Sequence, residues 1–172
     1  NKQIETVGEA SERFNEDALR MMRAVRFQSQ LGFDLEYETQ VAVQKYAPLL
    51  KKIAVERIQI EFEKLLLGKW RSNGIDTMIQ TNLYEYCPGL SEAEGALKDL
   101  LSSSRKVSND IEAWSLLCYY MEKNLSSFNS RLFLRQWKLS NRVIDGVETV
   151  LNGVKNRKET PEDDAWYLFN LG

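Results

Sequence analysis

Apolar residues recur at intervals of three and four along most of the chain, which is the spacing of one face of an α-helix. The pattern predicts a helix over about 11–30, which ends at Leu31-Gly32-Phe33 because glycine readily adopts the left-handed conformation after a helix. Further helices are predicted at about 37–46, 54–67, 75–81, 92–103, 111–122, 126–137 and 141–154, and another begins at Thr160. No alternating run is long enough to predict a strand. The expected fold class is therefore all-α, an irregular array of many helices.

Between these helices, Asn73-Gly74 predicts a turn, and the serine-rich stretch 102–106 is the best candidate for a domain boundary. The aromatic side chains of the second half are expected in the core rather than in a base-stacking site: Trp114, Tyr119, Tyr120, Phe133 and Trp137.

Composition narrows the class of protein. The 172 residues are 43% hydrophobic and 28% charged, as in a soluble globular chain, and no apolar run is long enough for a membrane span. A net charge of −2 argues against a general nucleic-acid coat. The absence of histidine excludes histidine bases and histidine-ligated zinc. Cys87 and Cys118 lack metal or redox spacing and are interpreted as ordinary thiols of a cytoplasmic protein.

One charged pattern stands apart from this composition. Four ionic residues recur every third position within the first helix: Asp17, Arg20, Arg23 and Arg26. Arginine offers a planar fork of donors and aspartate offers acceptors, so the two together resemble the hydrogen-bonding edge of a nucleobase. The hypothesis is a protein-made template that pairs with a base. The alternative is an amphipathic helix whose basic face is simply solvated.

The same stretch carries a resemblance to a known family. Arg13-Phe14-Asn15-Glu16-Asp17-Ala18-Leu19-Arg20 resembles the Glu-Asp-x-x-Arg motif of class II tRNA nucleotidyltransferases, the CCA-adding enzymes. Val55-Glu56-Arg57-Ile58 with Glu61 resembles the family's next motif. The stretch 135–142 is similar to the body of Bacillus-type members, so the resemblance covers nearly the whole chain.

The resemblance implies roles for individual residues. Asp17 and Arg20 would make Watson–Crick-like hydrogen bonds to the base of incoming CTP or ATP, and Arg23 and Arg26 would also bind the nucleotide. Glu16 would orient Arg20. A supporting role beside this helix is implied for three further residues, Glu56, Arg57 and Glu61. The product would be cytidine, cytidine and adenosine added to the 3′ end of tRNA.

The resemblance also implies an order of parts: a linker at 1–10, a neck at 11–70, a helical body at 71–155 and the start of a tail at 156–172. Catalysis in the family depends on Mg²⁺ bound by a Gly-Ser and Asp-x-Asp head, and neither motif occurs here. We therefore expect a neck and body fragment with no catalytic or metal-binding residues, inactive alone.

Two alternatives stay open at this stage. A poly(A) polymerase, or an enzyme adding only CC or only A, shares the neck motif. A helical binding module without a nucleotide site is a different class. The sequence does not determine the oligomeric state.

Overall fold

The structure is a computed structural model, and it describes residues 3–4, 9–163 and 166. The helices are α1 (Ala10–Glu16), α2 (Leu19–Leu31), α3 (Tyr37–Tyr46), α4 (Val55–Leu66), α5 (Arg71–Gln80), α6 (Glu94–Ser102), α7 (Asp110–Asn124), α8 (Ser130–Gln136) and α9 (Asn141–Arg157), with 3-10 turns η1 (Ala47–Lys52) and η2 (Leu83–Tyr86). Strands β1 (Gln3–Ile4) and β2 (Asp34–Leu35) form one short parallel pair. The all-α prediction is confirmed, and the paired strands are too short to give a sequence pattern. Among the described residues, no helix is both long and apolar enough to cross a membrane.

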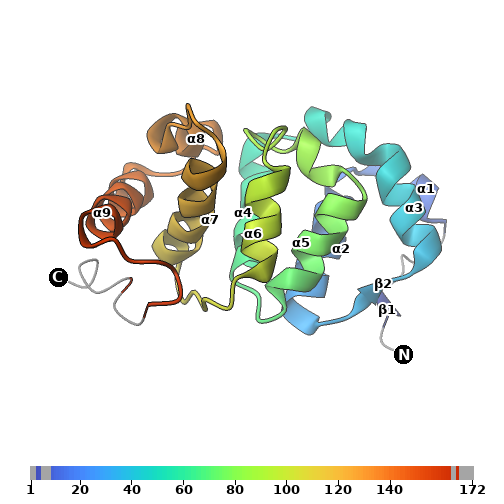
Figure 1. The fold of residues 1–172 in the computed structure, drawn as a ribbon. Coiled ribbons are helices and arrows are strands. Elements are labelled where there is room, and N and C mark those ends of the chain that lie inside the picture. Colours follow the sequence, from blue (N-terminus) through green and yellow to red (C-terminus); the bar gives the residue numbers. More distant parts are fainter. Residues whose placement is uncertain (1–2, 5–8, 164–165, 167–172) are drawn as a thin grey trace.

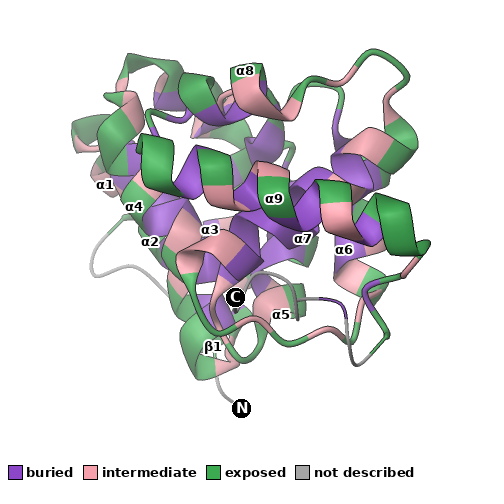
Figure 2. Cartoon of the chain, turned by 90° about the vertical axis from the view of Figure 1, so that its left-hand side faces the viewer, coloured by how far each residue is buried: buried purple, intermediate pink, exposed green. Residues whose placement is uncertain are grey.

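Figure 1 shows α1 and α3 at one end of the molecule and α8 and α9 at the other. Helix α2 packs on α4 and α5, α5 packs on α6, α6 on α7, and α7 on α9. Helix α8 lies against α9, and α1 lies against α3. Figure 2 shows buried positions on the inner side of α9 and exposed positions on its outer side, as an amphipathic helix requires. The expected boundary between neck and body, at residues 70 and 71, stays a prediction.

The predicted first helix is interrupted. Helix α1 ends at Glu16, and Asp17 has an extended backbone with φ −148° and ψ 101° before α2 begins. The Asp17 carboxylate accepts a hydrogen bond of 3.0 Å from the Leu19 backbone N–H. An aspartate side chain can accept a hydrogen bond from the backbone N–H two residues ahead, and this local bond competes with continuing the first helix. The end of α2 is as predicted, since Gly32 has φ 76°.

Helix α2 approaches its neighbours closely enough for backbone contact. The Ser29 hydroxyl donates to the Leu65 carbonyl, and the Trp70 N–H donates to the Ser29 carbonyl at 2.8 Å. A Cβ atom on Gly74 would lie 2.6 Å from the Val25 carbonyl oxygen. The Asn73-Gly74 turn prediction is therefore wrong: Gly74 lies inside α5, where the lack of a side chain admits α2.

An aromatic cluster joins the two halves of the chain. Phe62 of α4 stacks on Trp137 with ring centroids 4.8 Å apart, and Trp114 of α7 tilts against both rings. The Trp114 indole N–H donates to the Glu63 carboxylate at 2.8 Å. The aromatic residues expected in the core are buried there, apart from half-buried Tyr119.

Other predicted boundaries shift by a few residues. Helix α6 begins at Glu94 instead of 92, and α8 is confined to Ser130–Gln136. Asn109 and Ser140 cap α7 and α9, since each side chain accepts a hydrogen bond from a backbone N–H of the first turn. Residues 160–163 form a turn in which the Thr160 N–H donates to Asp163. The helix predicted beyond them falls largely on 164–165 and 167–172, outside the described residues.

We predict that Gly74→Ala destabilises the fold by about 2 kcal/mol, because the new methyl group must push the backbone of α2 away from α5. Gly95→Ala is the matched control, since its Cβ would meet only the end of the Asn124 side chain. Urea denaturation of the two variants measures the difference. Equal stability of both would contradict a backbone contact at Gly74.

Both cysteines are buried and free, and burial raises the pKa of the Cys87 and Cys118 thiols. The thiols therefore stay neutral at pH 7–8, and the neutral form reacts slowly. We expect neither thiol to react rapidly with a chromogenic disulfide reagent until urea unfolds the chain. A rapid phase in the native protein would show that at least one thiol is accessible.

Candidate functional site

The charged residues singled out in the sequence meet where the start of α2 faces α4. Asp17 lies at the junction of α1 and α2, and Arg20, Arg23 and Arg26 follow along α2. Helix α4 presents Glu61 and neighbouring side chains to this face. The opposite side of α2 is apolar and buried at Met21, Met22 and Val25.

Glu61 is the buried centre of this face. Its carboxylate is only 8% exposed and lies 3.1 Å from Nε of Arg26 and 4.0 Å from Nε of Arg23. The Arg26 guanidinium also lies 4.5 Å from the centre of the Phe27 ring. A buried carboxylate needs a positive partner, so this pairing holds two arginines of α2 in place.

Asp17 has both carboxylate oxygens engaged. One accepts the Leu19 N–H, and the other lies 3.7 Å from a terminal nitrogen of Arg57. An ionised carboxylate has about four acceptor sites, so these two contacts leave capacity for a further donor. Arg57 is half exposed, and Asp17 is 28% exposed, so solvent or a ligand reaches the pair.

Arg20 has a partner on the preceding helix. Glu16 lies 3.6 Å from Arg20 and 3.6 Å from Arg13, so one carboxylate is shared by two arginines. The Arg20 side chain stays 38% exposed. Its fork of five N–H donors exceeds what this single long contact uses, so donors remain for a ligand.

The predicted residues therefore assemble as three contacts: Glu16 with Arg20, Asp17 with Arg57, and Glu61 with Arg23 and Arg26. Glu56 is the exception, being exposed and without an ion pair among the described residues. Sequence reasoning missed the contributions of Arg13 and Phe27, which are visible only as neighbours of the motif. Arginine side chains outnumber carboxylate side chains at this face, which favours an anionic ligand.

We found no group of three or more histidine, cysteine, aspartate or glutamate side chains that could hold a metal ion within the described part of the chain. The charged side chains of this face are hydrogen-bond donors and acceptors carried by α1, α2, α4 and the junction at Asp17. This face can recognise a polar edge or an anion by hydrogen bonding.

The comparisons with known proteins define a class. A family model described as "Probable RNA and SrmB- binding site of polymerase A" matches residues 32–94. A second, described as "tRNA nucleotidyltransferase domain 2 putative", matches residues 105–172. The helical fold and these two matches make the chain similar to the helical regions of tRNA nucleotidyltransferases.

Comparison with individual relatives is more specific than the family models. The chain is 46% identical over 173 residues to the CCA-adding enzyme of Enterococcus faecalis and 43% identical over 172 residues to that of Bacillus mycoides. It also matches the crystal structure of the Bacillus stearothermophilus CCA-adding enzyme in complex with CTP, with a TM-score of 0.85, 40% identity and 99% of this chain covered. The chain is thus homologous to CCA-adding enzymes over nearly its whole length. It spans 42% of the length of each of these three relatives.

We predict that Glu61→Gln destabilises the fold by roughly 2 kcal/mol, because Arg26 would keep a largely covered charge without its carboxylate. Glu56→Gln on the same helix is the matched control and should cost less than about 0.5 kcal/mol. Thermal and urea unfolding measure both changes. A Glu61→Gln variant as stable as the control would show that the buried pair does not hold α2 against α4.

Proposed function

We propose that this chain is the base-reading part of a CCA-adding tRNA nucleotidyltransferase, which adds C, C and A to the 3′ end of tRNA. In this proposal Asp17 and Arg20 pair with the base of the incoming CTP or ATP. The observation that carries this proposal is that Asp17 and Arg20 are both accessible and both held by an ion pair. Arg57 pairs with Asp17, and Glu16 pairs with Arg20. The homology to CCA-adding enzymes supports the same assignment.

The donor and acceptor pattern explains why this pair suits both C and A. Cytosine and adenine each present an amino donor beside a ring nitrogen acceptor on the pairing edge. A carboxylate accepts from the amino group, and a guanidinium donates to the ring nitrogen. Uracil and guanine place a carbonyl acceptor beside a ring N–H donor, so the same two side chains oppose them. One fixed pair thus selects two bases without a nucleic-acid template.

Arg23 and Arg26 add positive charge next to the proposed base site and complete the nucleotide contacts in this proposal. Arg23 is 44% exposed and can reach an anionic group of the nucleotide, whereas Arg26 is mostly covered. Glu61 holds both arginine side chains by ion pairing, so its role is to position them. Rigid support of this kind is what discrimination between similar bases needs.

Mg²⁺ would supply the two-metal chemistry of phosphoryl transfer in the whole enzyme. The described residues of this chain do not form a carboxylate cluster that fits it, so we assign no step of the transfer to them. The tRNA 3′ end is the second proposed substrate. The cytoplasmic location stays a prediction.

A second candidate has one observation in its favour. The description of the model matching residues 32–94 names polymerase A, so a poly(A)-adding product, or addition of only CC or only A, shares this part of the fold. The same base-reading pair would serve these reactions. The nucleotides that the full-length enzyme incorporates decide among them, whereas a non-catalytic helical module would incorporate none.

The test uses the full-length enzyme that contains this segment and a tRNA lacking its 3′ CCA. Single-nucleotide incorporation is measured with CTP, ATP, UTP and GTP for the wild type, Asp17→Ala and Arg20→Ala. We expect both variants to keep polymerisation and to lose at least tenfold in the preference for C and A, because one fixed hydrogen-bonding partner is gone.

Glu12→Ala is the control, since Glu12 is exposed on α1 and lies outside the three contacts. It should keep the wild-type preference. If Asp17→Ala and Arg20→Ala also keep it, α2 does not read bases and its arginines form a solvated face.

A further inference from the structure

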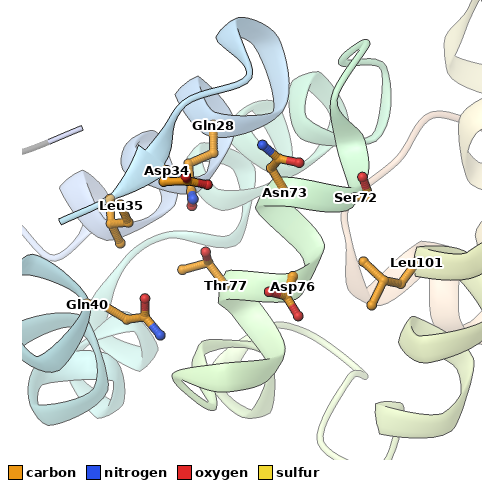
Figure 3. A pocket seen from close by; sticks show the side chains of 9 residues that line it. All are labelled: Gln28, Asp34, Leu35, Gln40, Ser72, Asn73, Asp76, Thr77 and Leu101. Atoms are coloured by element: carbon orange, nitrogen blue, oxygen red, sulfur yellow. The ribbon is translucent and has the colours of Figure 1, made fainter. Parts of the chain in front are cut away.

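A second polar site lies on a different side of α2. Residues of α2, β2, α3, α5 and α6 line an open pocket of about 410 Å³ (Figure 3). Gln28 brings α2 into this lining, and it stands ~200° around the helix from Arg26. The pocket therefore does not belong to the arginine face that the proposed function uses.

Gln28 indicates that this pocket receives a polar group. Its side chain is only 3% exposed, and its amide oxygen accepts no hydrogen bond from the described protein atoms. Figure 3 shows the side chain extending from α2 toward Asp34 and Thr77, on the inside of the pocket. A buried acceptor without a donor is costly, and a donor supplied by a ligand would remove that cost.

The charge of the lining specifies the ligand further. Asp34 of β2 and Asp76 of α5 contribute two carboxylates, and no lysine or arginine lines the pocket. The remaining polar groups, including the amides of Gln40 and Asn73, are neutral. Carboxylates only accept hydrogen bonds, so a matching ligand carries positive charge and N–H donors.

The shape of the lining separates an organic cation from a metal ion. The two carboxylates come from separate elements, and Leu35 and Leu101 add apolar surface beside them. A volume of about 410 Å³ lies in the range of small-molecule pockets and exceeds what a single ion fills. Within the described residues, no third acidic or other metal-binding side chain joins Asp34 and Asp76 to form a metal site.

We propose that this pocket binds a small aliphatic diamine. One ammonium group pairs with Asp34 and the Gln28 amide oxygen, and the other pairs with Asp76. The methylene chain crosses the pocket between them, with Leu35 beside Asp34 at one end and Leu101 beside Asp76 at the other. This assignment rests on the pocket alone and does not depend on the base-reading proposal.

The test is calorimetric titration of the 172-residue chain with 1,4-diaminobutane at physiological salt, where diffuse attraction of cations is screened. We expect saturable binding at one site. n-Butylamine, with one ammonium group, should bind at least tenfold more weakly, and 1,4-butanediol, with none, should not bind. Equal binding of the diol would overturn the charge argument, and no binding of the diamine would reduce the pocket to a solvent-filled crevice.

Two variants locate the site. Asp76→Asn removes one carboxylate from an exposed position on α5 and should weaken diamine binding at least tenfold. Glu85→Gln is the control, because Glu85 is an exposed acid outside the pocket, and it should change the affinity less than twofold. Equal losses in both variants would mean non-specific attraction. Mg²⁺ competing with the diamine at similar concentrations would reassign the site to an inorganic cation.

Discussion

The pairing of the buried Glu61 carboxylate on α4 with two arginines of α2 is the interaction on which the arrangement of these two helices depends. The carboxylate sits on α4 among apolar residues that pack into the core, yet it carries a charge that burial makes costly. Arg26 and Arg23 of α2 neutralise it. The two helices can therefore meet only in the register that brings these side chains together. One turn further along, the Ser29 hydroxyl bonded to the Leu65 carbonyl holds the same register.

The register between α2 and α4 determines which face of α2 is buried and which stays exposed. On one side Gly74 of α5 lets the α2 backbone come into contact, so the helix cannot rotate without a clash. On another side the arginines remain partly exposed above Glu61. Helix α4 also carries Phe62 into the aromatic cluster with Trp114 and Trp137, which anchors the site to the second half of the chain. Helix α4 thus links the site to the aromatic cluster.

The distinction between a solvated basic helix and a recognition site depends on whether the charged side chains have fixed partners. Each of Arg20, Arg23 and Arg26 lies within 4.0 Å of a carboxylate, and Asp17 is held by the Leu19 N–H and Arg57. Flexible arginines would lose rotamer entropy on binding a base, whereas paired ones have already lost much of it. This arrangement supports the base-reading proposal over a merely solvated face.

The sequence by itself determined the helices whose signals are local. The Tyr37–Tyr46 helix, the glycine end at Gly32, the caps at Asn109 and Ser140, and the motif around Asp17 could all be read from neighbouring residues. Only the tertiary structure decided the break at Asp17, the place of Gly74 inside α5, the pairing of Glu61 with two arginines and the pocket at Gln28. Helical periodicity says which residues share a face, but not which distant face they meet. Burial of charge and close backbone contact are properties of two elements together, so they become defined only when the helices pack.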